Sequence, residues 1–342
     1  MATETREFAA RRERTALRAA HERHSVGARA ANATDVDLGN YAAVMFDTAL
    51  WVSATPLLPD AARPGVLGAA LAWVVRSAVE GASRVVIVDN VDEARAGIAA
   101  RRAAYFDIPI DVLGVHGAAA SAAHDTVAPA EHAAVISPRR EHLECARALA
   151  TPGAEIVVEH GVVSLEVAGL EVARVGDEAG QSIVSIGVGA HDRETFRMLH
   201  GTTATPEQLR DVVRTVERHR SPGAPSHPLN LLAPERAMRS RATSNPQSIG
   251  LRSLAAVEPP VPRANVKDGV PCCAVGRDTN DADTVVVFVA GVDLDAVPFA
   301  ADARDRHARG AQLLIVAPSR NIVPLQERIA GKLREPARFV PA

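Results

Sequence analysis

Short apolar runs rich in valine, isoleucine and leucine alternate with amphipathic segments towards both ends of the chain. The clearest run, at 84–88, is a β-branched stretch bounded by polar residues, and it predicts a buried strand. A helix is expected over 92–106, because its first turn is acidic and arginines lie near its end. With a second strand over 110–115, this order predicts a parallel pair joined by a crossover helix.

Four closely spaced β runs occupy the middle of the chain, at 155–158, 162–167, 170–175 and 183–188. Their short, glycine-containing connections predict an antiparallel meander. Two helices are expected next, over 192–200 and 206–219, with Thr205 and Pro206 as N-cap and first residue of the second helix. Proline, serine and asparagine are then frequent over 244–271, which predicts an extended connector.

The order of strands and helices returns near the C-terminus. Strands are expected over 284–289 and 313–316, helices over 297–308 and 323–333, and an edge strand at 339–340. We therefore predict an α/β fold, with Rossmann-like βα units at both ends and a β-meander plus helices inserted between them. One composite sheet and two separate lobes both remain open.

Five regions follow from this pattern. They are a charged N-terminal arm (1–40), an N-terminal α/β region (41–150), a β-meander plus two helices (151–220), a Pro-rich helix and connector (221–280) and a C-terminal α/β region (281–342). Within the arm, residues 1–24 are charged and alanine-rich, and they predict an exposed or frayed helix.

Charge and cysteine content narrow the class of protein. The formal net charge of −3 and the pI of about 6.5 lack the basic excess of nucleic-acid and membrane-surface binders. Three cysteines without paired spacing, Cys145, Cys272 and Cys273, predict reduced thiols and a cytoplasmic protein. No segment reaches the roughly 20 apolar residues needed to cross a bilayer. A protein partner stays open.

Familiar cofactor and catalytic motifs do not occur in the sequence. There is no complete GxGxxG, no GxxxxGK[ST], no HExxH and no GxSxG, and the 12 histidines lack zinc-ligand spacing. The sequence therefore predicts no metal site, disfavours an NAD site and indicates no other cofactor. It leaves open whether the protein is an enzyme.

Candidate binding residues follow three of the predicted strands, where open parallel sheets hold their ligands. The last of these turns contains Ser319, Arg320 and Asn321, which together with helix N-terminal amides suit a phosphate or carboxylate. Helix capping by Ser319 or Asn321 is the simpler alternative. The other two turns contain Asp89, Asn90 and Asp92 after the run at 84–88, and Gly291, Asp293 and Asp295 after the run at 284–289.

The stretch 187–201 is the most distinctive part of the sequence. Gly187 and Gly189 permit close backbone approach, His191 is a candidate acid or base, and Arg193 is a candidate anion-binding side chain. The alternative is a tight turn with ordinary surface charges. Asp293 is a second candidate catalytic group.

These candidates predict a site for a small molecule that bears a phosphate or carboxylate group. We expect His191, Arg193 and Arg320 to converge on it. Whether that site serves binding alone or catalysis is left open.

Two alternatives remain. Glu159, Glu166 and Glu171 on the meander are similar to the carboxylates of PD-(D/E)XK nucleases, but no lysine accompanies them, so such a fold would be inactive or divergent. A non-catalytic interaction module would instead use the Pro-rich stretch 259–263 and a helix face with Arg236 and Arg239, which is expected to be solvated.

Five stretches resemble a family of uncharacterised proteins from high-GC actinobacteria. They are GLEVARV (169–175), GVGAHDRE (187–194), HPLN (227–230), PPVPRANVKD (259–268) and GVDLDAVPFAADAR (291–304). The likeness covers most of the chain outside the first forty residues. It implies no particular activity, cofactor or site residue.

Overall fold

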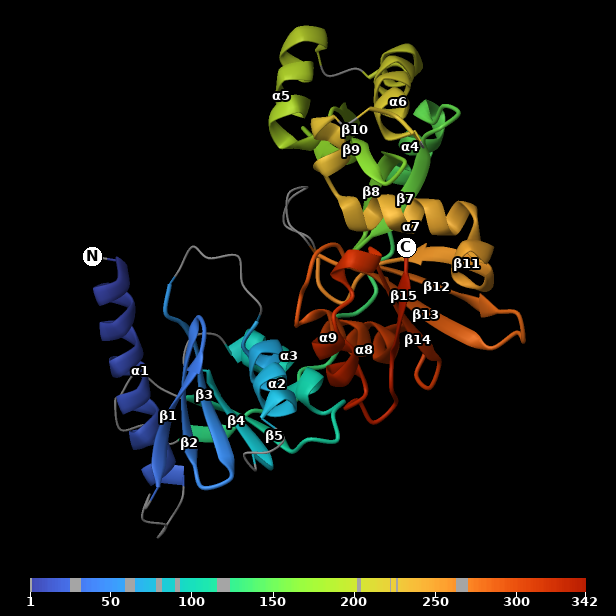
Figure 1. The fold of residues 1–342 in the computed structure, drawn as a ribbon. Coiled ribbons are helices and arrows are strands. Elements are labelled where there is room, and N and C mark those ends of the chain that lie inside the picture. The colour runs from blue at the N-terminus through green and yellow to red at the C-terminus, as the bar shows by residue number, and fades with distance from the viewer. Residues whose placement is uncertain are drawn as a thin grey trace. The chain divides into compact units, whose positions relative to one another are not determined.

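The apolar runs form three separate β-sheets in the part of the chain that the structure describes (Figure 1). The structure is a computed structural model, and it describes residues 2–24, 32–58, 65–77, 82–89, 93–115, 124–201, 204–221, 223–225, 227–262 and 270–342. Helices and mixed sheets confirm the predicted α/β class, and the two ends of the chain form separate sheets.

Two compact units divide the chain. The first consists of Met1–His132, Val292–Asp302 and Ile322–Arg338, and the second of Ala133–Gly291, Ala303–Asn321 and Phe339–Ala342. The chain therefore returns to the first unit twice after leaving it, so residues far apart in the sequence share one core.

A six-stranded mixed sheet forms the centre of the first unit. Its strands, in spatial order, are β1 (Ala33–Leu38), β2 (Tyr41–Phe46), β3 (Ala49–Pro56), β4 (Arg84–Asp89), β5 (Ile110–Val115) and β6 (His124–Thr126). Strands β3, β4 and β5 are parallel, and the other neighbours are antiparallel. Helix α2 (Val66–Arg76) connects β3 to β4, and α3 (Glu93–Ala103) connects β4 to β5. The predicted parallel pair with its crossover helix is confirmed.

Helix α1 (Ala2–His24) covers one face of this sheet. Leu17 and Ala20 are almost completely buried against β2 and β3, and His21 stacks on Phe46 with ring centroids 4.0 Å apart. The expectation of an exposed arm is therefore wrong for this face of the helix. The buried stripe consists of few and small apolar residues among many charged ones, so the hydrophobic pattern of the sequence does not reveal it.

Alternate residues of β4 face the two sides of the sheet. Val86 and Val88 belong to the core beneath α1, whereas Val85 and Ile87 point to the side that α2 and α3 cover. A strand buried on both faces reads as a continuous apolar run, which is why 84–88 is so clear in the sequence.

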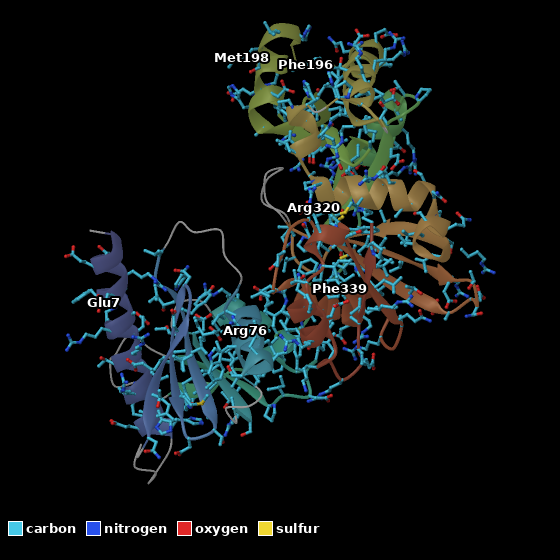
Figure 2. All side chains as sticks on the ribbon, in the orientation of Figure 1. Glu7, Arg76, Phe196, Met198, Arg320 and Phe339 are labelled. Carbon is cyan, nitrogen blue, oxygen red and sulfur yellow. The ribbon has the colours of Figure 1, made fainter. Side chains whose placement is uncertain are left out.

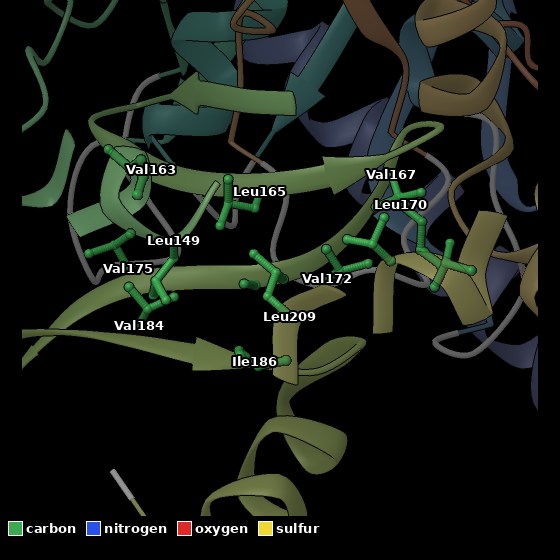
Figure 3. Packing of buried hydrophobic residues seen from close by; sticks show 14 residues of the cluster. Leu149, Val163, Leu165, Val167, Leu170, Val172, Val175, Val184, Ile186 and Leu209 are labelled. Carbon is green, nitrogen blue, oxygen red and sulfur yellow. The ribbon is translucent and has the colours of Figure 1, made fainter. Parts of the chain in front are cut away.

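An antiparallel meander forms part of the second unit. Its strands are β7 (Glu155–Glu159), β8 (Val162–Val167), β9 (Leu170–Glu178) and β10 (Gln181–Ile186), as predicted. Helices α4 (Arg140–Leu149) and α6 (Pro206–Arg220) pack on one face, and α5 (Gly189–His200) follows β10. Figure 3 shows strand residues such as Leu165 and Val172 close to Leu149 and Leu209 of these helices. Thr205 caps α6 through a reciprocal pair of hydrogen bonds with Gln208.

The tight turn between β8 and β9 requires glycine. Gly169 has φ +77°, and a methyl group there would lie 2.2 Å from the backbone oxygen of Arg236. We expect Gly169→Ala to destabilise the protein by about 2–4 kcal/mol, because positive φ and overpacking add. Gly180→Ala is the control, since Gly180 has φ +79° with nothing within 4 Å, and it should cost about 1 kcal/mol. Chemical denaturation of both variants measures this difference, and equal costs would contradict the close approach.

The third sheet has the order β11 (Leu251–Val257), β12 (Cys272–Asp278), β13 (Asp283–Phe288), β14 (Gln312–Ala317) and β15 (Arg338–Pro341). Helix α7 (Pro234–Ser244) packs on it through Met238 and Ala242. The remaining elements are α8 (Ala296–His307), α9 (Pro324–Ala330) and the short 3-10 helices η1 (Pro228–Leu231), η2 (Pro246–Ile249) and η3 (Ser319–Asn321).

The connector expected over 244–271 is wrong in part. Residues 246–257 form η2 and the edge strand β11, which pairs antiparallel with β12. Only Leu251 of this strand is buried, so its own sequence gives little β signal and the pairing depends on β12. Of the helices in the described ranges, none is long and apolar enough to cross a bilayer.

Candidate functional site

A cavity of about 230 Å³ lies in the first unit, at the carboxyl ends of β3 and β4. Six segments of the unit line it. The lining residues are Tyr41 and Ala54 from β2 and β3, Gly65, Val66 and Leu67 at the start of α2, Asp89 from β4, Arg95, Ile98, Ala99 and Arg102 from α3, and Asp295 before α8. This is the edge at which open parallel sheets hold ligands.

Local structure explains how these residues reach one place. Tyr41 pairs with Pro56, the last residue of β3, and Asp89 is the last residue of β4. Arg95 and Arg102 are seven residues apart on α3, so they lie on one face of the helix. The chain then supplies Asp295 from a segment more than 190 residues further on, because 292–302 returns to this unit.

The Asp295 carboxylate caps the start of α2. Its oxygens accept hydrogen bonds from the backbone N–H groups of Gly65 and, at 3.1 Å, Gly68. The first turn of α2 has no acidic residue of its own, so Asp295 supplies the negative charge that a helix N-terminus favours. A methyl group at Gly68 would lie 2.6 Å from the backbone of Leu294, so glycine permits this approach.

Burial raises the pKa of Asp295 to about 6, and the neighbouring carboxylate of Asp293 contributes to this rise. The charge of Arg102 and the two N–H groups of α2 lower the pKa, but they do not offset burial. Burial also raises the pKa of Asp293, which accepts a hydrogen bond from the backbone N–H of Asp295. A carboxyl group whose pKa is near neutrality is suited to accept and donate protons.

The raised pKa of Asp295 predicts that the stability of the first unit depends on pH. In the unfolded chain this carboxyl group titrates near the ordinary aspartate pKa of 3.8, so the unfolded state loses the proton at lower pH than the folded state. Below about pH 4 Asp295 is protonated in both states and does not change the free energy of unfolding. As the pH rises to about 6, Asp295 lowers the free energy of unfolding progressively, by about 3 kcal/mol in all. We expect Asp295→Asn to gain this amount relative to the wild type between pH 4 and pH 7.

Tryptophan fluorescence during urea denaturation measures this effect. Both tryptophans of the protein, Trp51 and Trp73, lie in the first unit, so the signal reports on that unit directly. Parallel stability profiles of the wild type and Asp295→Asn across this pH range would contradict the raised pKa.

Asp89 and Arg95 form an ion pair in the wall of the cavity. Arg95 donates from Nε and Nη2 to the two carboxylate oxygens of Asp89, at 2.9 and 3.0 Å. The Asp89 side chain is 2% exposed and that of Arg95 is 46% exposed. The buried carboxylate thus fixes the orientation of a half-exposed guanidinium group in the cavity wall.

Asp302 anchors the second arginine of the cavity. Its buried carboxylate accepts hydrogen bonds from Arg101 at 2.7 and 3.1 Å, Arg102 at 3.0 Å and Tyr105 at 3.3 Å. Arg102 also lies over Phe299, with the guanidinium carbon 5.4 Å from the ring centre. These two contacts fix the plane of a guanidinium group that lines the cavity, which favours bidentate binding of a carboxylate or phosphate.

The Gly187 turn has a structural explanation. Gly187 has φ +139°, and a methyl group there would lie 2.7 Å from the backbone nitrogen of Arg193. Arg193 itself donates to Glu171 at 2.9 Å, while His191 is exposed and Gly189 begins α5. Figure 2 labels Phe196 and Met198 on the same helix, of which no residue is buried.

Ser319, Arg320 and Asn321 form η3, directly after β14 in the second unit (Figure 2). Ser319 and Arg320 are exposed. Among the described contacts, no hydrogen bond or ion pair joins Arg320 to His191 or Arg193, which follow a different sheet.

Among the sequence-predicted residues, the structure brings together aspartates that the other two turns contain. Asp293 lies in the first unit beside Asp295, and Asp295 shares the cavity with Asp89. Asn90 and Asp92 lie outside the described residues.

Arg236 and Arg239 are buried, so the expectation of a solvated helix face is wrong. Their side chains are 9% and 3% exposed, and they form ion pairs with Glu159 and Glu166 on β7 and β8. Helix α7 packs on the third sheet with its apolar residues, and its arginines meet the meander. Arginines therefore neutralise these carboxylates. No group of three or more side chains suited to hold a metal ion occurs among the residues that the structure describes.

Sequence reasoning did not single out Tyr41, Arg95 and Arg102. A signal for the arginines exists, because their spacing of seven residues follows directly after a strand end that carries Asp89. Tyr41 has no comparable signal, since it reaches the cavity through pairing with β3.

Searches against protein-family models, curated proteins and solved structures found no match for this chain.

Proposed function

We propose that the cavity of the first unit binds a small molecule that carries a carboxylate or phosphate group. The observation that supports this proposal is the convergence of Arg95, Arg102, Asp89 and Asp295 on one cavity at the carboxyl ends of parallel strands. Arg102 supplies the positive charge for the anionic group, and its plane is held by Asp302.

The volume of the cavity limits the size of the ligand. A cavity of roughly 150 Å³ accommodates benzene, which has six non-hydrogen atoms. By proportion, about 230 Å³ suits a compound of about nine non-hydrogen atoms. This is the size of a short-chain organic acid or a small phosphate ester.

Asp295 adds a group for proton transfer. Because its pKa is about 6, its carboxyl group exchanges a proton near neutral pH at small cost in free energy. Asp295 is therefore suited to act as a general acid or base on a bound ligand that has an acidic or basic group next to it. Ligand binding is the first property to test, because catalysis depends on it.

A thermal-shift screen tests the proposed site. At 100 times its dissociation constant a ligand adds about 2.7 kcal/mol of stability, which raises Tm by roughly 5–10 °C. We expect Arg102→Lys to lose most of this shift, because a lysine ammonium group does not reproduce the planar pair of donors. The matched control is Arg320→Lys, an exposed arginine after β14, which should leave the shift unchanged.

The opposite result would place the binding site elsewhere in the protein. If Arg320→Lys removes the shift and Arg102→Lys retains it, the ligand binds at η3 and not at this cavity. A screen of carboxylates and phosphate esters without any shift would overturn the proposed function.

A further inference from the structure

The two arginines of the cavity differ in how many of their N–H donors bind other residues of the protein. Arg95 gives both Nε and Nη2 to Asp89. Arg102 gives Nε to Asp302, and among the described residues its Nη1 and Nη2 groups have no hydrogen-bond partner. The Arg102 side chain is 16% exposed and lines the cavity, so these terminal donors are available to a ligand.

The two carboxylates of the cavity differ in the same way. Both oxygens of Asp89 accept hydrogen bonds from Arg95. Each oxygen of Asp295 accepts a single backbone N–H, from Gly65 or Gly68. A carboxylate has about four lone-pair positions, so Asp295 can accept two further hydrogen bonds.

The charges of the described residues that line the cavity also balance. Asp89 and Asp295 offset Arg95 and Arg102, so a simple anion would gain from Arg102 and be repelled by Asp295. Arg102 is close enough to Asp295 for its charge to lower the pKa of that carboxyl group. One small ligand in a cavity of about 230 Å³ therefore contacts both side chains.

We propose that the ligand carries a hydroxyl or ammonium group next to its anionic group, so that the anion binds Arg102 while the donor binds Asp295. This inference rests on the proposed function and narrows the ligand to small hydroxy acids, amino acids and hydroxylated phosphate esters. The donor offsets the repulsion that Asp295 exerts on a plain anion, because Asp295 then accepts a hydrogen bond.

Matched ligands test this inference. Lactate and alanine differ from propionate by one hydroxyl or ammonium group, and glycerol phosphate differs from propyl phosphate by its hydroxyls. We expect the hydroxylated or aminated member of a pair to bind the wild-type protein about ten- to a hundredfold more tightly, as measured by calorimetry at pH 7. The carboxylate and phosphate pairs distinguish the two kinds of anionic group.

Asp295 variants connect the preference to this side chain. Asp295→Asn keeps the size of the residue and should reduce the alanine-over-propionate preference to less than about threefold, because the ammonium group loses its counter-charge. Asp111→Asn is the control, since Asp111 pairs with Arg84 at 2.6 Å and does not line the cavity. It should retain the full preference.

The outcomes separate the two proposals. Equal binding of both members of every pair to the wild type would overturn this inference and leave the proposed function intact. A preference that Asp295→Asn retains would also overturn it, because another group would then accept the donor. Absence of binding by all of these compounds would overturn both.

Discussion

Replacing Asp302 with asparagine is expected to lower the free energy of unfolding of the first unit by about 3–5 kcal/mol. The carboxylate of Asp302 is completely buried and is paired with Arg101 and Arg102, whose side chains are 9% and 16% exposed. Asparagine keeps the size of the side chain, but both guanidinium groups lose the carboxylate that neutralises them. An uncompensated charge in a buried site costs more than one lost neutral hydrogen bond, which is worth about 0.5–1.5 kcal/mol.

Urea denaturation followed by tryptophan fluorescence measures this loss, since both tryptophans lie in the first unit. Asp111→Asn is a matched control, because its ion pair with Arg84 is half-exposed, at 32% for Asp111 and 49% for Arg84, and should contribute less than about 1 kcal/mol. If Asp302→Asn costs no more than Asp111→Asn, the buried cluster does not stabilise the unit.

Replacing Arg236 with methionine should destabilise the second unit by about 3–5 kcal/mol. Arg236 pairs with both Glu159 and Glu166, and the Glu166 side chain is 3% exposed. Burial already raises the pKa of Glu166, against the charges of Arg236 and Arg239. Methionine fills the space of the arginine stem, so the loss arises from the carboxylates that lose a counter-charge and not from a cavity.

Far-UV circular dichroism is the appropriate signal for this unit, which contains no tryptophan. Arg140→Met serves as the control, because Arg140 and Glu144 pair at 2.7 Å with side chains 86% and 53% exposed. Adding Glu166→Gln to Arg236→Met should recover part of the stability, since Arg239 and Glu159 then remain as a balanced ion pair at 2.7 Å. A loss in Arg236→Met equal to that in Arg140→Met would show that burial does not matter here.

Elements with a complete local signal could be predicted from the sequence. The run at 84–88 became β4 because a strand buried on both faces is apolar throughout. The meander became β7 to β10 because its strands are joined by short glycine turns, and Thr205 caps α6 because capping is a contact between neighbours in sequence.

Elements whose burial depends on a distant partner could not be predicted in this way. Helix α1 carries mostly charged residues, and its few small apolar residues are recognised as core residues only because they pack against β2 and β3. Arg236 and Arg239 have the sequence pattern of a solvated face, and Glu159 and Glu166 explain their burial from 70 or more residues away.

The same distinction between local signals and distant partners applies to the candidate site. The sequence by itself determined that Asp89 and Asp295 follow strands, because polar residues after apolar β runs mark the ends at which ligands gather. Only the tertiary structure decided that Asp89 and Asp295 share one cavity, since Asp295 reaches the start of α2 by a return of the chain to the first unit. Hydrophobic periodicity is a property of residues that are close in sequence. The partner of a buried charge is distant in sequence and is determined only when each unit folds around its core.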